Sequence, residues 1–469
     1  MSIKSTTGNV AISTTPTVNT KVKLSMRSKL AYGLMDGGGG LIYSYVILFV
    51  MFFATDVYGV NAAVMGTVLL ISRLWDAIND PIIGGLADRT RSRWGVYRPW
   101  ILFSSIPMVI LTILLFTSMP FPTEMGRTIY MVVVFLLFVT AFTCVNIPYS
   151  AMTASLTQDT DERAKLTTYR QIFANSFGLF IAGLGTLTFV GLLGQGNMEK
   201  GFLWTTIIFG IITIVVYVVG FLGTKEVVVP PVQKQTFKEM FHSMKGNKPA
   251  WIVAIGFFVL GVFLYGRATV YMYYFTYNAG NSNLMTTFML FLGIGAIIGI
   301  ALVPKINSMV SNKSFLIRGG FIIGGILMVV TYFVDPISNW TLFIILNVII
   351  AALIYGGTAT IYGMIPDTVE YGEHKTGTRA AGFISSFVNF IMKLGMTIGM
   401  ASVGFLLAIF GYQAGVSQPE SVLNGINMIM NLFPGILCIL SGLVFFAYKL
   451  DRKTYYELFN EIEARSHKS

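Results

Sequence analysis

The chain has 469 residues, of which 54% are hydrophobic and 11% are charged. Soluble domains carry roughly 25% charged residues, so this composition excludes a soluble globular protein and indicates a surface that faces lipid. The net charge of +11 is distributed in short clusters between apolar runs. That distribution favours the positive-inside pattern of membrane proteins over nucleic-acid binding.

Cysteine and histidine usage narrows the class further. Cys144 and Cys438 lie inside apolar runs, which argues against a disulfide framework. His242, His374 and His467 lie in polar segments, so the sequence offers no intramembrane histidine relay or metal cluster and no cofactor is expected. These patterns disfavour a membrane-embedded enzyme, and the absence of a repeated filter motif disfavours a channel.

Twelve segments are long enough to cross a bilayer, which takes about 20 apolar residues in a helix. They are predicted to be helices because backbone groups in lipid must satisfy their own hydrogen bonds. Residues 1–30, which are basic and rich in Ser and Thr, are predicted to form a cytoplasmic tail. In chain order, the predicted spans are 31–55, 62–87, 99–119, 128–155, 170–194, 203–223, 250–277, 284–304, 315–334, 341–365, 380–410 and 426–448.

Orientation follows from the basic residues. With the N-terminus in the cytoplasm, 27 of the 32 Lys and Arg residues fall on the inside, two fall in outside loops and three lie within spans. The cytoplasmic linker 224–249 then divides the spans into six-helix bundles at 31–223 and 250–448, followed by a cytoplasmic tail at 449–469. Two parallel six-helix repeats predict an all-α membrane protein with the major facilitator fold and a site between the halves.

Charged residues inside the spans need a reason, because each costs about 2.5–3.5 kcal/mol at the bilayer centre. The acids are Asp36, Asp76 and Asp80, and the bases are Arg73, Arg267 and Lys393. Their equal numbers suggest an interior in which the charges compensate one another.

The densest group lies in the second span. Asp76, Asn79 and Asp80 have the spacing that places them on one helix face, one turn beyond Arg73. Two neighbouring carboxylates repel each other unless a cation or a shared proton lies between them, so the group is a candidate cation site. The alternative is that the acids only neutralise Arg73 and Lys393 as structural ion pairs.

The remaining intramembrane charges have open roles. Lys393 is expected to pair with the carboxylates of the second span, either as a static counter-charge or to couple sugar and cation occupancy. Arg267, close to Tyr271, Tyr273 and Tyr274, could bond a sugar or belong to a gate ion pair. Asp36 precedes four glycines and is expected near the cytoplasmic end.

Several motifs resemble the glycoside–pentoside–hexuronide:cation symporter family, which includes the melibiose permease, over nearly all of residues 27–455. They are the Arg-Leu-Trp-Asp-Ala-Ile-Asn-Asp-Pro run at 73–81, the Asp-Arg-Thr-Arg-Ser-Arg run at 88–93, Tyr-Gly-Leu-Met-Asp at 32–36 and Ile-Pro-Asp-Thr-Val-Glu at 365–370. The resemblance implies a major facilitator fold and cation-driven sugar uptake.

Residue by residue, the resemblance implies cation ligands at Asp76, Asn79, Asp80 and Thr143, which would hold Na⁺ if the protein is sodium-coupled. It implies that the lysine of the eleventh helix is Lys393 and that a fifth-helix arginine near the sugar is Arg170.

The chain departs from the melibiose permease at three positions. Gly40 and Asn146 replace sugar-binding aspartates, and Ser150 replaces a tryptophan. The sequence is more similar to the xyloside and pentoside branch.

The function expected from these residues is symport of a glycoside, pentoside or related oligosaccharide with Na⁺ or H⁺. The sugar is expected to contact side chains of both halves, namely Asn146, Tyr149, Arg170, Arg267, Asn389 and Lys393. The inner gate is expected to form from Arg73, Asp88, Arg89, Asp367 and Glu370. Alternatives are an uncoupled facilitator or exchanger and a hexuronide transporter of the same fold.

The cellular setting is expected to be the plasma membrane of a bacterium. The expected partners are a small sugar and the lipid bilayer, with no nucleic acid, and the protein is expected to work as a monomer.

Overall fold

The computed structural model describes residues 23–157, 159–227, 246–310, 312–376 and 381–451, with short stretches at 454–455, 457–458 and 461. Most of the predicted N-terminal tail and of the linker 224–249 lies outside the described residues.

The first half of the chain forms helices joined by short turns. They are α1 (Met26–Phe52) with the π-helical segment η1 (Phe53–Val57), α2 (Ala62–Arg89), α3 (Arg98–Leu115), α4 (Glu124–Leu156), α5 (Thr160–Ser176) running through η2 (Phe177–Gly185) into α6 (Thr186–Gly194), and α7 (Met198–Gly223).

The second half repeats this arrangement. Its helices are α9 (Lys248–Tyr273) with η3 (Tyr274–Asn278), α10 (Leu284–Met309), α11 (Ser314–Tyr332), α12 (Trp340–Thr376), α13 (Ala381–Ile409), and α14 (Glu420–Asn427) running through η4 (Met428–Leu432) and α15 (Phe433–Val444) into η5 (Phe445–Ala447). With each continuous run counted once, the described helices make twelve passes, which confirms the predicted fold class.

The second pass differs from the others in composition. Eleven of the described helical runs are long and apolar enough to span a membrane, and the described apolar stretch of α2 is Ala62–Ser72. Its remaining turns carry the charged residues Asp76 and Asp80. Charged turns inside a membrane protein require a polar interior, so α2 must face other helices or water there.

Two predicted boundaries were wrong in the same direction. The structure continues α12 through Pro366 to Thr376, so the segment 367–373 is helical and not a loop. It begins α5 at Thr160, ahead of the predicted start at Arg170. Apolar length marks the part of a helix in lipid, but polar residues extend the same helix beyond it, and membrane helices tolerate proline.

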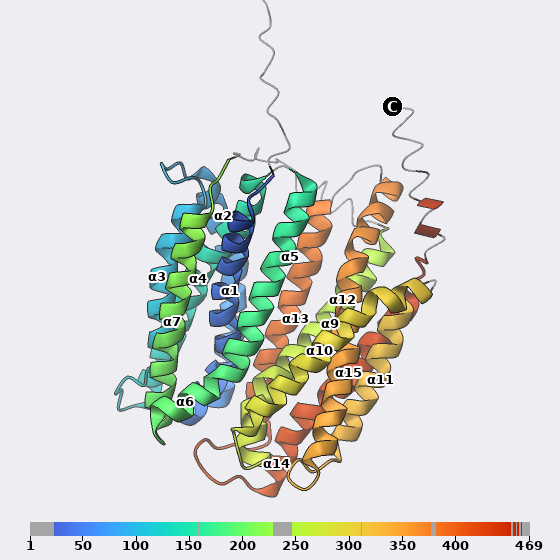
Figure 1. Ribbon diagram of the computed structural model, residues 1–469. Coiled ribbons are helices and arrows are strands. Elements are labelled where there is room, and N and C mark those ends of the chain that lie inside the picture. Colours follow the sequence, from blue (N-terminus) through green and yellow to red (C-terminus); the bar gives the residue numbers. More distant parts are fainter. Residues whose placement is uncertain are drawn as a thin grey trace, which may run out of the picture.

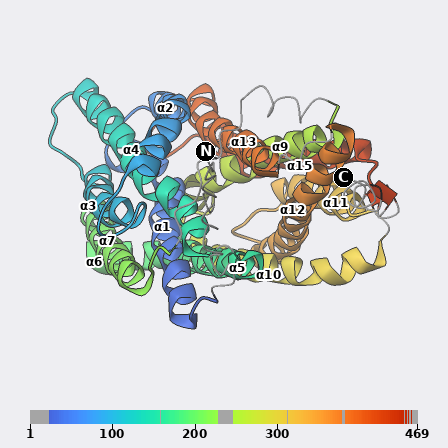
Figure 2. The ribbon, with the colours of Figure 1, turned by 90° about the horizontal axis from the view of Figure 1, so that it is seen from above.

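The two groups of helices stand side by side, with α1–α7 on one side and α9–α15 on the other (Figure 2). In the upright view, α1 starts at the upper end and α14 lies at the lower end (Figure 1). We call the upper end the Met26 end and the lower end the η1 end. Between the groups, α2 packs against α13 and α1 against α9.

Glycine permits the closest helix contact. A Cβ atom at Gly395 of α13 would lie 2.1 Å from the carbonyl oxygen of Phe258 in α9, and one at Gly399 would lie 2.2 Å from that of Val262. Small residues at these positions let the two backbones pack directly together. This contact fixes the position of α13, which carries Lys393.

The first helix of each half ends in the same way. Thr55 and Asp56 are the third and fourth residues of η1, and Thr276 and Tyr277 are the third and fourth residues of η3. A glycine with positive φ follows three residues after Asp56 and three after Tyr277, at Gly59 and Gly280.

Side-chain hydrogen bonds join the halves at the η1 end. The carboxylate of Asp56 accepts hydrogen bonds from the hydroxyls of Tyr277 and Tyr412. Beside it, the hydroxyls of Thr55 and Tyr273 lie 2.7 Å apart. This group was not predicted from the sequence, because Asp56 lies one residue beyond the predicted first span.

The hydrogen bonds of Asp56 predict a conformational effect of its removal. Asp56→Ala deletes the acceptor of two bonds between the halves, each contributing about 1.5–3 kcal/mol when one partner is charged. We expect a cysteine at Val46, a residue of α1 that lines a cavity between the two groups of helices, to react with a water-soluble maleimide applied from the η1 end at least about tenfold faster than in the parent. Labelling is measured after replacement of Cys144 and Cys438 by Ser.

The matched control is Asp335→Ala. Asp335 lies in the turn between α11 and α12, and among the described residues its side chain bonds only to Ile337 and Ser338 of that turn. It should leave the labelling rate unchanged. Equal labelling of the parent and Asp56→Ala would show that these bonds do not hold the η1 end closed.

Candidate functional site

A cavity of about 350 Å³ lies between the two groups of helices. Residues of α1, α2 and α4 line one side, and residues of α9, α12 and α13 line the other. The polar wall includes Asp36, Asp76, Asp80, Asn146, Asn389 and Lys393. The volume falls at the lower end of the range of about 300–1,000 Å³ typical of small-molecule sites.

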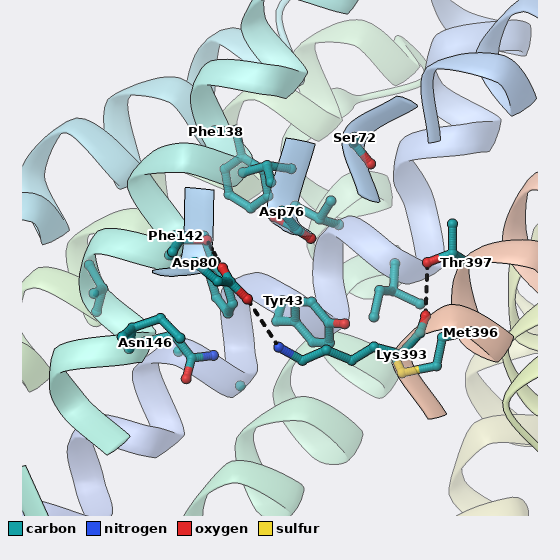
Figure 3. Close-up of a pocket in the computed structure, with 18 of the residues that line it drawn as sticks. Tyr43, Ser72, Asp76, Asp80, Phe138, Phe142, Asn146, Lys393, Met396 and Thr397 are labelled. Carbon is teal, nitrogen blue, oxygen red and sulfur yellow. Dashed lines mark hydrogen bonds and ion pairs between the residues drawn. The ribbon is translucent and has the colours of Figure 1, made fainter. Parts of the chain in front are cut away.

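Asp80 is the centre of a polar contact that crosses the cavity. The hydroxyl of Thr143 in α4 donates to Asp80 Oδ1 at 3.1 Å, and Lys393 Nζ of α13 lies 3.7 Å from Asp80 Oδ2 (Figure 3). The side chain of Lys393 is 55% exposed and that of Asp80 is 28% exposed. The predicted pairing of Lys393 with an α2 carboxylate is therefore present, and the pair stays accessible from the cavity.

Of the other predicted cation ligands, some line the cavity and one does not. Asp76, one turn before Asp80 in α2, also lines the cavity, as does Thr143. Asn79 does not line it: its side chain is buried at 5% exposure and its Nδ2 atom has no hydrogen-bond partner among the described residues. The side chain of Arg73 lies outside the described part of the chain.

Hard oxygen atoms therefore gather on one wall of the cavity. Carboxylates at Asp76 and Asp80 with the neutral hydroxyl of Thr143 are the ligand types that small hard cations prefer. A proton could occupy the same place, because two close carboxylates favour a shared proton. Among the described residues, no group of three or more His, Cys, Asp or Glu side chains is arranged to hold a metal ion.

The predicted sugar contacts come from both halves. Asn146 and Tyr149 of α4 and Asn389 of α13 line the cavity. Asn389 uses its Nδ2 atom to bond the carbonyl of Ser385 at 2.8 Å, which leaves its amide oxygen as an acceptor. Ser150 donates to Asn146 Oδ1 at 3.4 Å.

Arg170 does not line the cavity itself but is bonded to Asp36, which does. Its Nε atom donates to Asp36 Oδ2 at 3.0 Å, and its guanidinium lies 4.7 Å from the ring centre of Tyr149. Asp36 lines the cavity, although its position near the four glycines had suggested the cytoplasmic end. The pairing of Asp36 with Arg170 depends on the packing of α1 against α5, which no sequence spacing reveals.

Arg267 lies apart from the cavity. It is buried at 2% exposure inside the second half, where Nε donates to the carbonyl of Met430 at 3.0 Å and a terminal nitrogen donates to Asn347 Oδ1 at 2.5 Å. The carbonyl of Met430 belongs to the π-helical segment η4. The structure places Arg267 where it supports this segment and not beside the predicted sugar contacts.

The predicted inner-gate residues form contacts within their own halves. Asp88 Oδ1 accepts from the hydroxyl of Tyr97 at 2.8 Å, and Asp367 accepts from Lys313 at 2.7 Å. Glu370 Oε2 is buried without a hydrogen-bond partner among the described residues. Arg89 is exposed at the end of α2. The structure therefore does not bring these charges together across the halves.

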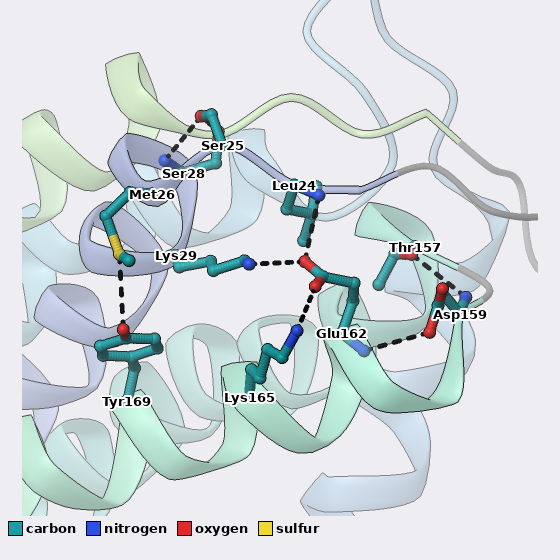
Figure 4. A network of polar contacts seen from close by, with 10 residues as sticks. All are labelled: Leu24, Ser25, Met26, Ser28, Lys29, Thr157, Asp159, Glu162, Lys165 and Tyr169. Atoms are coloured by element: carbon teal, nitrogen blue, oxygen red, sulfur yellow. Dashed lines mark hydrogen bonds and ion pairs between the residues drawn. The ribbon is translucent and has the colours of Figure 1, made fainter.

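A buried carboxylate ties α1 to α5 at the Met26 end. Glu162 accepts from the backbone N–H of Leu24 at 3.1 Å, from Lys29 at 2.7 Å and from Lys165 at 2.9 Å (Figure 4). The hydrogen bonds from the two lysines lower the pKa of Glu162 to about 2. This contact holds the start of α1, which leads to Asp36, against the start of α5, which leads to Arg170.

Comparison with known proteins agrees with this arrangement. Residues 29–452 match the family described as MFS/sugar transport protein. The isoprimeverose transporter of Lactiplantibacillus pentosus is 32% identical over 443 residues, which cover 90% of this chain and 88% of that one. The uncharacterized symporter YnaJ of Bacillus subtilis (strain 168) is 33% identical over 451 residues, which cover 94% and 96%.

A solved structure shows the same fold. The bacterial homologue of the human lysosomal transporter Spinster, in an inward-facing and unoccupied conformation, superposes with a TM-score of 0.68 at 15% identity. The match covers 92% of this chain and 97% of that one.

The twelve passes and the cavity between two six-helix groups define a transporter of the major facilitator superfamily. Within it, the chain belongs to the MFS/sugar transport family and to its glycoside–pentoside–hexuronide:cation symporters, which confirms the resemblance seen in the sequence motifs.

The buried position of Arg267 predicts a structural effect. Arg267→Lys cannot make both hydrogen bonds, and each buried polar group left unpaired costs about 1–3 kcal/mol. We expect the thermal unfolding midpoint to fall by several degrees while the apparent affinity for the transported sugar stays within about threefold of the parent, or roughly 0.7 kcal/mol. Lys393→Met, a change inside the cavity, should instead weaken the apparent affinity for the sugar and leave the thermal unfolding midpoint nearly unchanged. A large loss of sugar affinity in stable Arg267→Lys protein would contradict this assignment.

The pKa of Glu162 predicts a pH dependence. A carboxyl whose pKa is lowered on folding stabilises the protein above its unfolded value of about 4.3, and this contribution disappears as the pH falls towards the folded value. Glu162→Gln should therefore be less stable than the parent at pH 7, and the difference in unfolding midpoint should shrink between about pH 4 and 2. A difference that is constant over this range would mean that the lysine contacts do not form in solution.

Proposed function

We propose that the protein imports a glycoside, pentoside or related oligosaccharide together with Na⁺ or H⁺ by alternating access. The observation that carries the proposal is the composition of one cavity. The acidic wall at Asp76 and Asp80 and the hydrogen-bonding side chains of Asn146 and Asn389 face the same space. A cation and a sugar bound there would lie close enough to affect each other's affinity.

Cation binding would begin at the α2 carboxylates. A cation between Asp76 and Asp80 offsets their mutual repulsion, which otherwise disfavours ionisation of both. Thr143 already contacts Asp80 and adds a neutral oxygen, which supports Na⁺ over H⁺ because a proton does not need it. Asn79 would join the ligands only after a rotation of its side chain or a small movement of α2.

Sugar binding would link the halves. Asn146, Tyr149 and Arg170 belong to the first half, and Asn389 and Lys393 belong to the second. A cation that competes with Lys393 for Asp80 would free the ammonium group to approach the sugar. The coupling between the two ligands is reciprocal, so each raises the affinity of the other by the same factor.

The transport cycle would alternate between closure at the two ends. The positive-inside pattern supports a cytoplasmic Met26 end and cytoplasmic termini, in the plasma membrane of a bacterium. The bonds of Asp56 then close the outer end, which corresponds to an inward-facing state. The charges at Asp88, Arg89, Asp367 and Glu370 would pair across the halves in the outward-facing state. A single chain holds the complete cavity, which supports function as a monomer.

A hexuronide is the second candidate substrate. The exposed ammonium group of Lys393 and its 3.7 Å separation from Asp80 leave it able to bind a sugar carboxylate. Neutral glycosides would not need this contact.

Substitution of either acid tests the cation role. Asp76→Cys or Asp80→Cys leaves one carboxylate and removes the repulsion that a cation relieves. We expect either change to abolish cation stimulation of sugar binding, measured as the ratio of sugar affinities with and without Na⁺ at fixed pH and across a pH series. Glu124→Gln, at the first turn of α4, is the carboxylate control and should keep the full ratio.

Counterflow in proteoliposomes tests the function as a whole. The panel contains xylosides, galactosides and glucuronides, each with and without Na⁺. Stimulated counterflow of at least one sugar is expected. Counterflow that depends on neither Na⁺ nor pH would indicate an uncoupled facilitator or exchanger, and strict dependence on a sugar carboxylate would indicate the hexuronide transporter.

A further inference from the structure

The cavity contains a second acidic group that the cation site does not use. Asp36, Gly39, Gly40 and Tyr43 line the cavity from successive turns of one face of α1. A Cβ atom at Gly40 would lie 2.8 Å from the carbonyl oxygen of Ala174 in α5, and one at Gly39 would lie 3.0 Å from the hydroxyl of Tyr217. A larger side chain at Gly40 would have to displace the backbone of α5, and one at Gly39 would have to shift the hydroxyl of Tyr217. Asp36 is therefore the carboxylate that α1 presents to the cavity.

The ion pair of Asp36 leaves hydrogen-bonding capacity unused. It joins Asp36 Oδ2 to Arg170 Nε, and both side chains are 23% exposed. Within the described part of the chain, Asp36 Oδ1 and the two terminal nitrogens of Arg170 make no hydrogen bond. These three atoms are not fully buried, so a ligand can reach them. Asp36 thus offers an acceptor at the cavity wall, and the unused donors of its partner Arg170 stand next to it.

A tyrosine stack holds the pair in place. Tyr149 lies beneath the guanidinium of Arg170 and stacks on Tyr32 with ring centres 4.8 Å apart. The hydroxyl of Tyr149 donates to the carbonyl of Tyr32 at 2.9 Å, and that of Tyr32 bonds Thr153. Both rings are buried, so the position of Arg170 is fixed before any ligand arrives. Groups ordered in advance lose less entropy on binding.

We infer that Asp36 and Arg170 form a subsite for two adjacent hydroxyl groups of the sugar, with Asp36 Oδ1 as the acceptor that selects among sugars. A hydroxyl can donate to the carboxylate while its neighbour accepts from the guanidinium. Bonds to charged groups are about twice as strong as those between neutral groups, so loss or inversion of the hydroxyl facing Asp36 should strongly weaken binding. This inference rests on the proposed sugar transport and adds the residue that sets its specificity.

The alternative is that Asp36 only neutralises a half-buried arginine. Deoxy sugars distinguish the two roles, because a structural pair affects all sugars alike. The experiment measures inhibition of counterflow by the best substrate of the panel and by each of its monodeoxy analogues. The proteins are the parent, Asp36→Asn and the double variant Asp36→Asn with Arg170→Gln, which leaves no unpaired charge if the single variant folds poorly.

In the parent, one deoxy analogue should bind about tenfold to a hundredfold more weakly than the full sugar. In Asp36→Asn, the full sugar should weaken by a similar factor, and the preference over that analogue should fall below about threefold. The stimulation of binding by Na⁺ or by protons should persist, because Asp76 and Asp80 are intact. The double variant should also lose the preference over that analogue.

An equal loss for the sugar and every analogue in stably folded protein would assign Asp36 a structural role and overturn the inference, while the transport function would stand. A preference for the full sugar over the deoxy analogue that is unchanged in either variant would also overturn the inference and leave the transport function standing. A parent protein that shows no counterflow with any sugar would instead overturn the proposed function, and the subsite with it.

Discussion

The cost of placing charge inside a membrane protein is the constraint on which this structure depends. In the described part of the chain, four intramembrane charges each lie beside a group that compensates them: Asp80 beside Lys393, Asp36 beside Arg170, Asp56 beside two tyrosine hydroxyls, and Arg267 beside a carbonyl and an amide. These pairings fall into two kinds. Arg267 is sealed within one half, whereas the pairs of Asp36 and Asp80 stay accessible from the cavity, where a ligand can exchange with a partner.

Sequence reasoning predicted the fold well because the bilayer imposes a simple rule on helix length. It also predicted the group formed by Asp76, Asp80, Thr143 and Lys393, since the first two are spaced by one helical turn and the others follow from the family motifs. Helix ends were less predictable, as Pro366 and Arg170 show, because polar turns extend helices beyond the apolar region.

Contacts between separate helices were the part that sequence could not supply. Arg267 seemed suited to bind sugar because tyrosines follow it, yet its burial depends on how η4 packs against α9. Asn79 shares a spacing with its acidic neighbours but lies outside the cavity wall. The position of a side chain around the helix axis decides such cases, and a difference of a fraction of a turn separates a cavity residue from a buried one.

The matching ends of α1 and α9 have a consequence for how such a molecule can arise from two like halves. Residues near the axis between the halves meet their own counterparts, and here the counterparts are Asp56 and Tyr277. Two identical copies of the first half would place two aspartates against each other. Two identical copies of the second half would place two tyrosine hydroxyls together with no carboxylate to accept their hydrogen bonds. Closure at this end through these bonds therefore requires that the two repeats differ at this pair of positions.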